Sequence, residues 1–248
     1  MTHILLPGTS TFSFLGALVA EFFLRWLHYL GGITWIGLLY YFNFVQGPFM
    51  AEADPATKST VTQKLLPRAL RWFRAGAIVT FGSGILIIGK RIGESPLGSA
   101  AWSTPWAITI LTGALFGTMM FLNVVAVILP KQHIVIASAR TTASGGQANP
   151  VAPGAARRAF LTSRTNVVFS IPMLFFMGAA SHLTPSGVGN HTAYWAGILL
   201  LIALLEINAL TATTGPTTKP IEKIPGVIIT GFVVWAIAYA LVRWFLSA

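Results

Sequence analysis

His28 is the residue of this chain best suited to bind a redox cofactor. Its imidazole can ligate haem iron, and it lies in a strongly apolar segment, where an ionisable side chain points to function. In the sequence HYLGGITW, Trp35 lies seven positions after His28, which places both on one helix face with Gly32 between them. The glycine leaves room for a flat ring or for a closely packed helix. A cofactor site and plain helix packing therefore both fit this stripe.

Two further histidines are expected near the same membrane surface as His28. His182 ends the apolar segment FSIPMLFFMGAASH, and His191 precedes the next apolar segment. This common depth predicts a haem or quinol site near the outer surface, with His28 and His182 as metal ligands and His191 as an alternative second partner. Met173 and Met177 are available as soft, weak ligands, although a Met in a helix bundle usually only fills space. The competing interpretation is that His182 and His191 are ordinary interfacial residues.

Glu206 is the candidate catalytic residue, because it is a carboxylate well inside a predicted span. It lies thirteen residues from the outer end of that span, or about 20 Å at 1.5 Å per residue. A charge at this depth is unfavourable. We therefore expect Glu206 to be protonated, to bond to a partner such as Asn123 or a hydroxyl, or to carry protons. Arg164, Thr165 and Asn166 begin the span before it, where they can cap a helix and bind lipid phosphate.

Six apolar stretches of roughly twenty residues each must position these side chains, since about twenty residues cross the hydrocarbon layer as a helix. Hydrophobic residues make up 54% of the chain and charged residues 9%, whereas about a quarter of a soluble protein is charged. The sequence therefore predicts an all-α, polytopic membrane helix bundle of about six transmembrane helices, forming one domain over residues 1–248. The predicted spans are 24–46, 67–89, 104–129, 164–182, 193–213 and 226–246.

The distribution of Lys and Arg predicts how the bundle is oriented. Twelve of the sixteen lie in the first, third and fifth loops or the adjoining helix ends; the other four are Arg25, Lys90, Arg91 and Arg243. The positive-inside rule then places both termini on the periplasmic side of a bacterial inner membrane. Membrane insertion thus explains the net charge of +10 without a nucleic-acid partner. The third loop, 130–163, is rich in Gly, Pro, Ala and Ser and predicts a mobile cytoplasmic connector.

Cysteine is absent from the sequence, which limits the redox chemistry. It excludes disulfides, thiolate metal sites, iron–sulfur clusters and the covalent attachment of haem c. A redox group would have to be held by other ligands, which leaves haem b or a quinol.

Three stretches of the chain resemble the membrane domain of the urate oxidase N-terminal family. They are RWLHYLGGITWIGLLYYFNFVQGPF at 25–49, MFLNVVAVILPKQ at 120–132 and SRTNVVFSIPMLFFMGAASH at 163–182. In that family a multi-helix membrane domain is often followed by a c-type cytochrome domain outside the cytoplasm, associated with bacterial urate oxidation. The resemblance implies a periplasmic cytochrome c as partner. Because residues 1–248 contain no haem-c motif, the electron transfer of the fused members is not carried over, and urate is not assigned as the substrate.

The pattern His-x6-Trp-x-Gly, which begins at His28, is also similar to haem-b membrane proteins such as membrane-bound protoporphyrinogen oxidases and copper-resistance membrane proteins. This similarity implies that His28 is an axial haem ligand.

Two functions are consistent with the sequence. The first is a redox subunit that binds haem b or quinol near the periplasmic face and passes electrons to a periplasmic cytochrome c or to other membrane subunits. Such a protein is a component of an oxidoreductase rather than a complete enzyme. The alternative is a non-catalytic accessory or assembly subunit packed on a larger membrane complex. A transporter fits less well, because polar residues within the spans are few and no internal repeat is visible.

Overall fold

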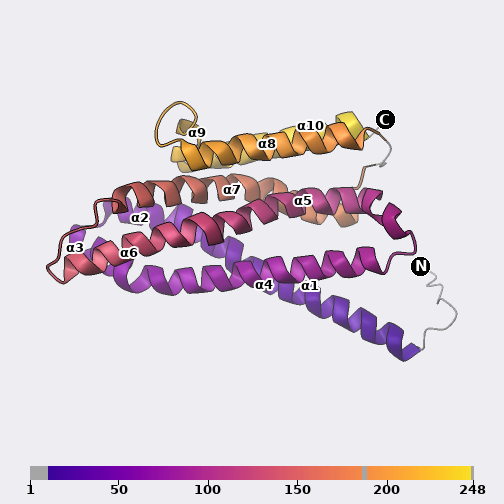
Figure 1. The fold of residues 1–248 in the computed structure, drawn as a ribbon, viewed down its shortest axis with the longest axis horizontal. Helices are drawn as coiled ribbons and strands as arrows, with labels where there is room; N and C mark the ends of the chain where they lie inside the picture. The colour runs from indigo at the N-terminus through magenta and orange to yellow at the C-terminus, as the bar shows by residue number, and fades with distance from the viewer. Residues whose placement is uncertain (1–10, 186–188, 247–248) are drawn as a thin grey trace.

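The computed structural model describes residues 11–185 and 189–246, which form helices and no strand. Seven long helices run along one axis of the bundle, joined by shorter helices and turns (Figure 1). This confirms the predicted all-α architecture. The long helices are α1 (Thr11–Tyr40), α4 (Leu66–Gly93), α5 (Pro105–Leu122), α6 (Leu129–Ala143), α7 (Ala152–His182), α8 (His191–Thr211) and α10 (Ile224–Leu246), and the short ones are α2 (Gly47–Glu52), α3 (Pro55–Thr60) and α9 (Lys219–Glu222).

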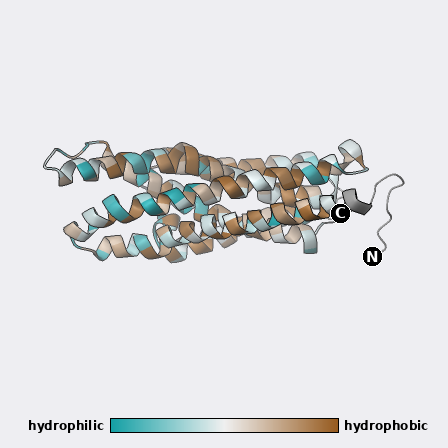
Figure 2. Ribbon diagram, turned by 90° about the horizontal axis from the view of Figure 1, so that it is seen from below, coloured by the Kyte–Doolittle hydropathy of each residue, from teal (hydrophilic) through white to brown (hydrophobic). Residues whose placement is uncertain are grey.

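Five helical stretches among the described residues are long and apolar enough to cross a membrane, which makes the protein multi-pass. They are Pro55–Gly93, Pro105–Ala143, Ala152–His182, His191–Thr211 and Ile224–Leu246. The predicted first span, 24–46, falls mainly in α1 and is not among these five. Hydrophobic residues predominate along the middle of the long helices (Figure 2), and many of their large side chains are exposed. In α7 67% of the most apolar window is buried, against 22–33% in the other four, so α7 is the central helix.

The described residues include three π-helical segments, each continuous with a helix on both sides and each ending two residues before a proline. A proline inside a helix donates no hydrogen bond, and its ring clashes with the carbonyl four residues earlier. In all three cases that carbonyl belongs to the π-helical segment, where the wider turn accommodates the clash. The segments are η1 (Tyr41–Gln46) before Pro48, η2 (Val61–Leu65) before Pro67 and η4 (Asn123–Ile128) before Pro130.

The prediction of a mobile connector over 130–163 is wrong, because most of this range is helical. Helix α6 occupies 129–143 and α7 begins at Ala152, so only 144–151 is a non-helical link. Ala and Arg favour helix on both sides, and Pro153 lies in the first turn of α7, where a proline is tolerated. Within the link, Gly145 has a φ of 85°, a conformation that favours glycine. The link is also anchored, because the backbone N–H of Asn149 donates to Ser138 Oγ at 2.9 Å.

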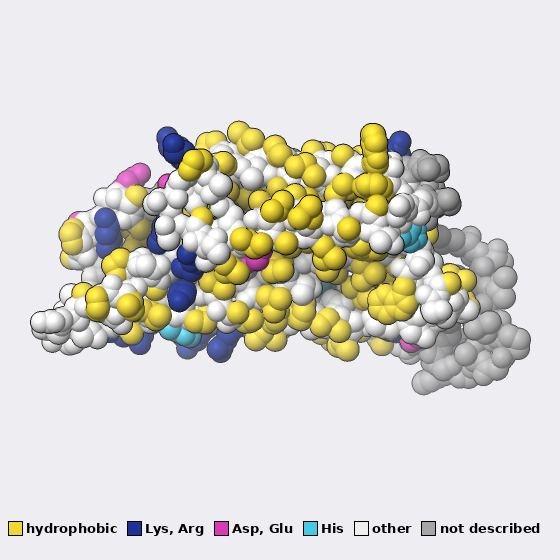
Figure 3. All heavy atoms as spheres, turned by 45° about the horizontal axis from the view of Figure 1, so that its top comes forward, with side chains coloured by type: hydrophobic (Ala, Val, Ile, Leu, Met, Phe, Trp, Pro, Cys, Tyr) yellow, Lys and Arg dark blue, Asp and Glu magenta, His cyan; other side chains and the backbone are white. Residues whose placement is uncertain are grey.

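The two ends of the bundle differ in charge. Lys and Arg gather at the end that carries α3, α6 and α9, on the left of the space-filling view, which we call the basic end (Figure 3). The described chain begins and finishes at the opposite end, which we call the terminal end (Figure 1). This separation agrees with the charge pattern behind the predicted orientation, and which end faces the cytoplasm stays a prediction.

The α1–α4 crossing places His28 against the rest of the bundle, and it depends on two glycines. A Cβ added to Gly76 would lie 2.9 Å from Trp35 N and 3.0 Å from Gly31 O. One added to Gly31 would lie 2.9 Å from Thr80 N. The two backbones therefore touch directly, as small residues allow in membrane helices.

We expect Gly76→Ala to separate α1 from α4 and to lower the free energy of unfolding by about 1–3 kcal/mol, because backbone atoms cannot move aside as a side chain can. The measurement is unfolding of the purified protein in mild detergent, followed by tryptophan fluorescence. Gly82→Ala on the same helix is the matched control, since its Cβ would meet no atom within 4 Å. Equal stability of the two variants would contradict the close crossing.

Candidate functional site

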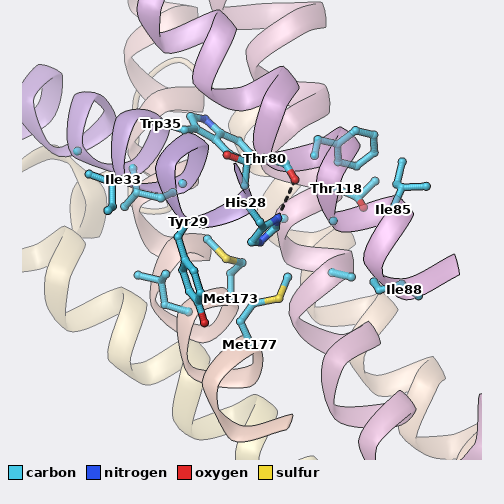
Figure 4. A pocket seen from close by; sticks show the side chains of 18 residues that line it. His28, Tyr29, Ile33, Trp35, Thr80, Ile85, Ile88, Thr118, Met173 and Met177 are labelled. Carbon is cyan, nitrogen blue, oxygen red and sulfur yellow. Dashed lines mark hydrogen bonds between the residues drawn. The ribbon is translucent and has the colours of Figure 1, made fainter. Parts of the chain in front are cut away.

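A cavity of about 390 Å³ lies between α1, α4, α5 and α7, and His28 stands in its wall (Figure 4). Its lining is almost wholly apolar, with Trp35 from the same face of α1, Thr80 from α4, and Met173 and Met177 from α7. His28 and Trp35 thus share one site, as their spacing predicts.

The imidazole of His28 is held in one orientation by α4. Its Nδ1 lies 2.9 Å from the carbonyl oxygen of Thr80 and 3.3 Å from Ser83 Oγ. Because a carbonyl only accepts, we assign the hydrogen to Nδ1, which leaves the Nε2 of the neutral ring with a free lone pair. Metal-binding histidines typically have their second nitrogen bonded in this way. His28 is therefore preorganised as a ligand or as a hydrogen-bond acceptor.

Glycine residues leave open space around the His28 imidazole. A Cβ added to Gly84 would lie 3.1 Å from His28 Cε1, so a larger residue there would push the imidazole away. Gly32, Gly37 and Gly117 also line the cavity. Glycines of α1, α4 and α5 therefore leave open space beside the imidazole, and a flat cofactor ring in this space stays a prediction.

Two methionines lie across the cavity from α1. Met173 and Met177 are one helical turn apart on α7, and their side chains approach the imidazole in the close-up view (Figure 4). A thioether is a soft ligand that pairs with histidine in some haem proteins. The sequence marks both residues as available ligands, but their position opposite His28 depends on the packing of α7 against α1.

The other predicted ligands lie elsewhere. His182 is exposed at the last residue of α7, five residues beyond Met177, and His191 begins α8. Neither lines the cavity. Among the described residues, no group of three or more His, Asp or Glu side chains could hold a metal ion. The structure thus brings His28 together with the methionines rather than with the other two histidines.

The cavity opens to the side of the bundle and has basic residues beyond its terminal end. Tyr29 and Ile33, which line it, are 67% and 72% exposed. Arg25 lies three residues before His28 and pairs with Glu21 at 2.6 Å. Arg91 lies three residues after the lining residue Ile88, and its guanidinium stacks on Trp106 at 4.5 Å. A ligand can therefore enter from the lipid side and meet positive charge towards the terminal end.

Glu206 belongs to a separate buried cluster. Its side chain is 7% exposed, and its Oε2 accepts from Asn123 Nδ2 at 2.9 Å, which confirms the predicted partner. The same Nδ2 donates to Asn166 Oδ1 at 2.9 Å, and Asn166 Nδ2 donates to Met120 O at 3.0 Å. None of these residues lines the His28 cavity.

The interpretation of Arg164, Thr165 and Asn166 as surface helix caps is wrong. Helix α7 begins twelve residues before Arg164, and all three side chains are buried. The predicted span begins at residue 164, where the apolar sequence begins, so it leaves out the helical residues 152–163. The extension bonds to the end of α8, since Arg158 Nη1 donates to Ala212 O at 2.9 Å.

The family model described as "Urate oxidase N-terminal" matches residues 98–241, more than half of the chain. The match runs from the turn before α5 into α10, so it includes the stretches 120–132 and 163–182 but not 25–49. The matched region therefore contains Met173 and Met177 of the cavity and the buried cluster around Glu206, whereas His28 lies before it. Neither the curated proteins nor the solved structures gave a match to the chain.

Proposed function

The chain belongs to the urate oxidase N-terminal family, and we propose that it is a bacterial inner-membrane redox subunit that holds haem b in the His28 cavity. Its electron partner is a periplasmic c-type cytochrome, in keeping with the fused architecture of the family. The observation that supports the proposal most directly is the bond from His28 Nδ1 to the Thr80 carbonyl, which leaves Nε2 free at an apolar cavity.

The residues around the cavity fit a haem b. His28 would bind the iron through its free Nε2, and Met173 or Met177 could supply a thioether sulfur. Glycines leave space for the flat macrocycle, and the apolar lining suits its hydrocarbon surface. Arg91, which forms no ion pair among the described residues, lies towards the terminal end, where it can neutralise an acidic substituent. When bound, haem supplies one-electron exchange at its iron, and the protein sets the potential through the axial ligands and the apolar surroundings.

A quinol is the second candidate ligand, and the lateral opening favours it. The exposed positions of Tyr29 and Ile33 leave a route from the lipid layer to His28. There the free Nε2 can accept a hydrogen bond from a quinol hydroxyl, while the Thr80 carbonyl keeps the ring in place.

The test is a reduced-minus-oxidised optical spectrum of the protein, purified in mild detergent after expression with haem supplied. A b-type spectrum with one haem per chain is the expected result. A protein without this signal contradicts haem binding, and solvent extraction then reports whether a quinone co-purifies. Cofactor-free protein that co-purifies at fixed stoichiometry with a larger complex would instead support the accessory-subunit alternative.

Gly84→Val should lower the haem content, because the added side chain would occupy the space of the His28 ring, 3.1 Å from the position of the new Cβ. We expect a loss of roughly tenfold, comparable to disturbing the outer contacts of a metal ligand. Gly82→Val is the control, since nothing lies within 4 Å of a Cβ on Gly82. Both variants introduce the same β-branched residue into α4. Equal haem contents, measured as haem absorbance per protein, would argue against His28 as the ligand.

A further inference from the structure

A second hollow of about 500 Å³ lies at the basic end, between α4 with its η2 extension and α6. We call it the basic groove. Its cations come from both walls: Lys64 from η2, Arg68, Arg71 and Arg74 from α4, and Arg140 from α6. His133 is a further lining residue on α6, and no acidic residue lines the groove.

Helical spacing places these cations on the helix faces that line the groove. Residues 64, 68 and 71 follow the spacing i, i+4, i+7 and so share one face, with Arg74 continuing it. The opposite wall has the same spacing at Leu129, His133, Ile136 and Arg140. Between the walls the buried side chains of Leu70, Leu129 and Ile136 form an apolar floor.

The groove cations are not neutralised within the described part of the chain. None of its three ion pairs includes them. Among the described residues, the one side-chain hydrogen bond that these cations donate runs from Arg68 Nη1 to Lys64 O at 2.6 Å. Arg157 and Arg158 of α7 differ, because Arg157 bonds to Thr213 O and Glu222, and Arg158 bonds to carbonyls at the end of α8. Neighbouring like charges without an acid favour an anionic ligand.

The groove lies at the depth of lipid head groups. Twenty residues separate Lys90, near the terminal end of α4, from Leu70, and twenty residues cross about 30 Å of hydrocarbon. Arg68 and Arg71 therefore flank the membrane boundary. Trp72 is 68% exposed at the same level, where an indole favours the interface.

We propose that the basic groove is a binding site for an anionic phospholipid. Its phosphate contacts the arginines of both walls, and its acyl chain follows the apolar floor of the groove into the bilayer. Arginine suits this role because its guanidinium can bind phosphate through two parallel hydrogen bonds. The site is independent of the His28 cavity and of its proposed cofactor.

The test is native mass spectrometry of the delipidated full chain in detergent, titrated with phosphatidylglycerol or phosphatidylcholine. Each cation near an anionic head group contributes about fivefold in affinity, so a variant with Arg68→Gln, Arg71→Gln and Arg140→Gln should bind phosphatidylglycerol about a hundredfold more weakly. The control is Lys58→Gln, Lys131→Gln and Lys223→Gln, which removes the same charge at the basic end but outside the groove lining. It should change the affinity less than about threefold.

Three results would overturn the proposal. The first is equal affinity of the wild type for the two lipids, which needs no variant and so holds even if the groove variant does not fold. The second is an equal loss in the groove and control variants, which would indicate a general electrostatic field. The third is displacement of the lipid by millimolar inorganic phosphate that itself binds the wild type, which would assign the groove to a soluble phosphate.

Discussion

Replacing His28 with alanine is expected to remove the b-type absorption of the purified protein while its helical content stays the same. In the proposed site the imidazole would supply the nitrogen ligand from the cavity wall, and its Nδ1 is already bonded to Thr80 O. Alanine leaves no group to take its place on α1. We expect haem content to fall at least about tenfold, measured by absorbance per protein, with helicity followed by circular dichroism.

His133→Ala is the matched control for this experiment. His133 lies at the basic end, in the wall of the basic groove and away from the cavity. Its replacement should leave the spectrum unchanged. A b-type signal that survives in His28→Ala but not in His133→Ala would contradict the proposed site.

Variants of the second ligand distinguish the arrangement in the structure from the one predicted by sequence. Met173→Leu and Met177→Leu keep most of the side-chain volume but remove the thioether, so loss of an axial sulfur should lower the midpoint potential. His182→Ala and His191→Ala should have no such effect, because neither residue lines the cavity. A shift seen only in His182→Ala would restore the histidine pair predicted from sequence.

The parts of the site that the sequence predicts are those with a local pattern. His28, Gly32 and Trp35 share one helix, so their common face follows from helical spacing alone, and all three line the cavity. Asn123 is a predicted partner of Glu206 because both are polar residues within apolar spans, where such groups seek one another.

The parts that the sequence does not predict depend on contacts between distant segments. Thr80 lies 52 residues from His28, and its role depends on the crossing of α1 and α4 at Gly31 and Gly76. A carbonyl acceptor of this kind leaves no side-chain signal in a sequence. The sequence predicts a common depth for three histidines, but depth does not fix which helix faces the cavity. As a result, the methionines of α7 occupy the place that the sequence assigns to His182.

The helix boundaries predicted from sequence are inaccurate for a related reason. A hydropathy window locates the hydrocarbon layer, whereas the helices extend beyond it. The stretch Pro105–Ala143 has 39 residues and is about 58 Å long, nearly twice the thickness of the apolar layer. The π-helical turn before Pro130 keeps it continuous where a proline would be expected to end it.

Asn123→Leu is expected to destabilise the bundle strongly, because one side chain satisfies two buried acceptors. Both hydrogens of its Nδ2 are donated, one to Glu206 Oε2 and one to Asn166 Oδ1, each at 2.9 Å. Leucine has a similar volume, so the change removes the donors without leaving a large cavity. Two unsatisfied acceptors should lower the free energy of unfolding by about 2–4 kcal/mol, measured by thermal or denaturant unfolding in detergent.

Glu206→Gln separates the structural role of this cluster from proton transfer. The carboxamide oxygen can accept the Asn123 hydrogen bond in place of the carboxylate, so the unfolding free energy should change by less than about 1 kcal/mol. A protein that keeps its stability but loses proton-coupled turnover with its electron partner would assign Glu206 a proton-carrying role. If Glu206→Gln instead unfolds as readily as Asn123→Leu, the Asn123 bond is not what stabilises the cluster, and a further partner of the carboxylate must be sought.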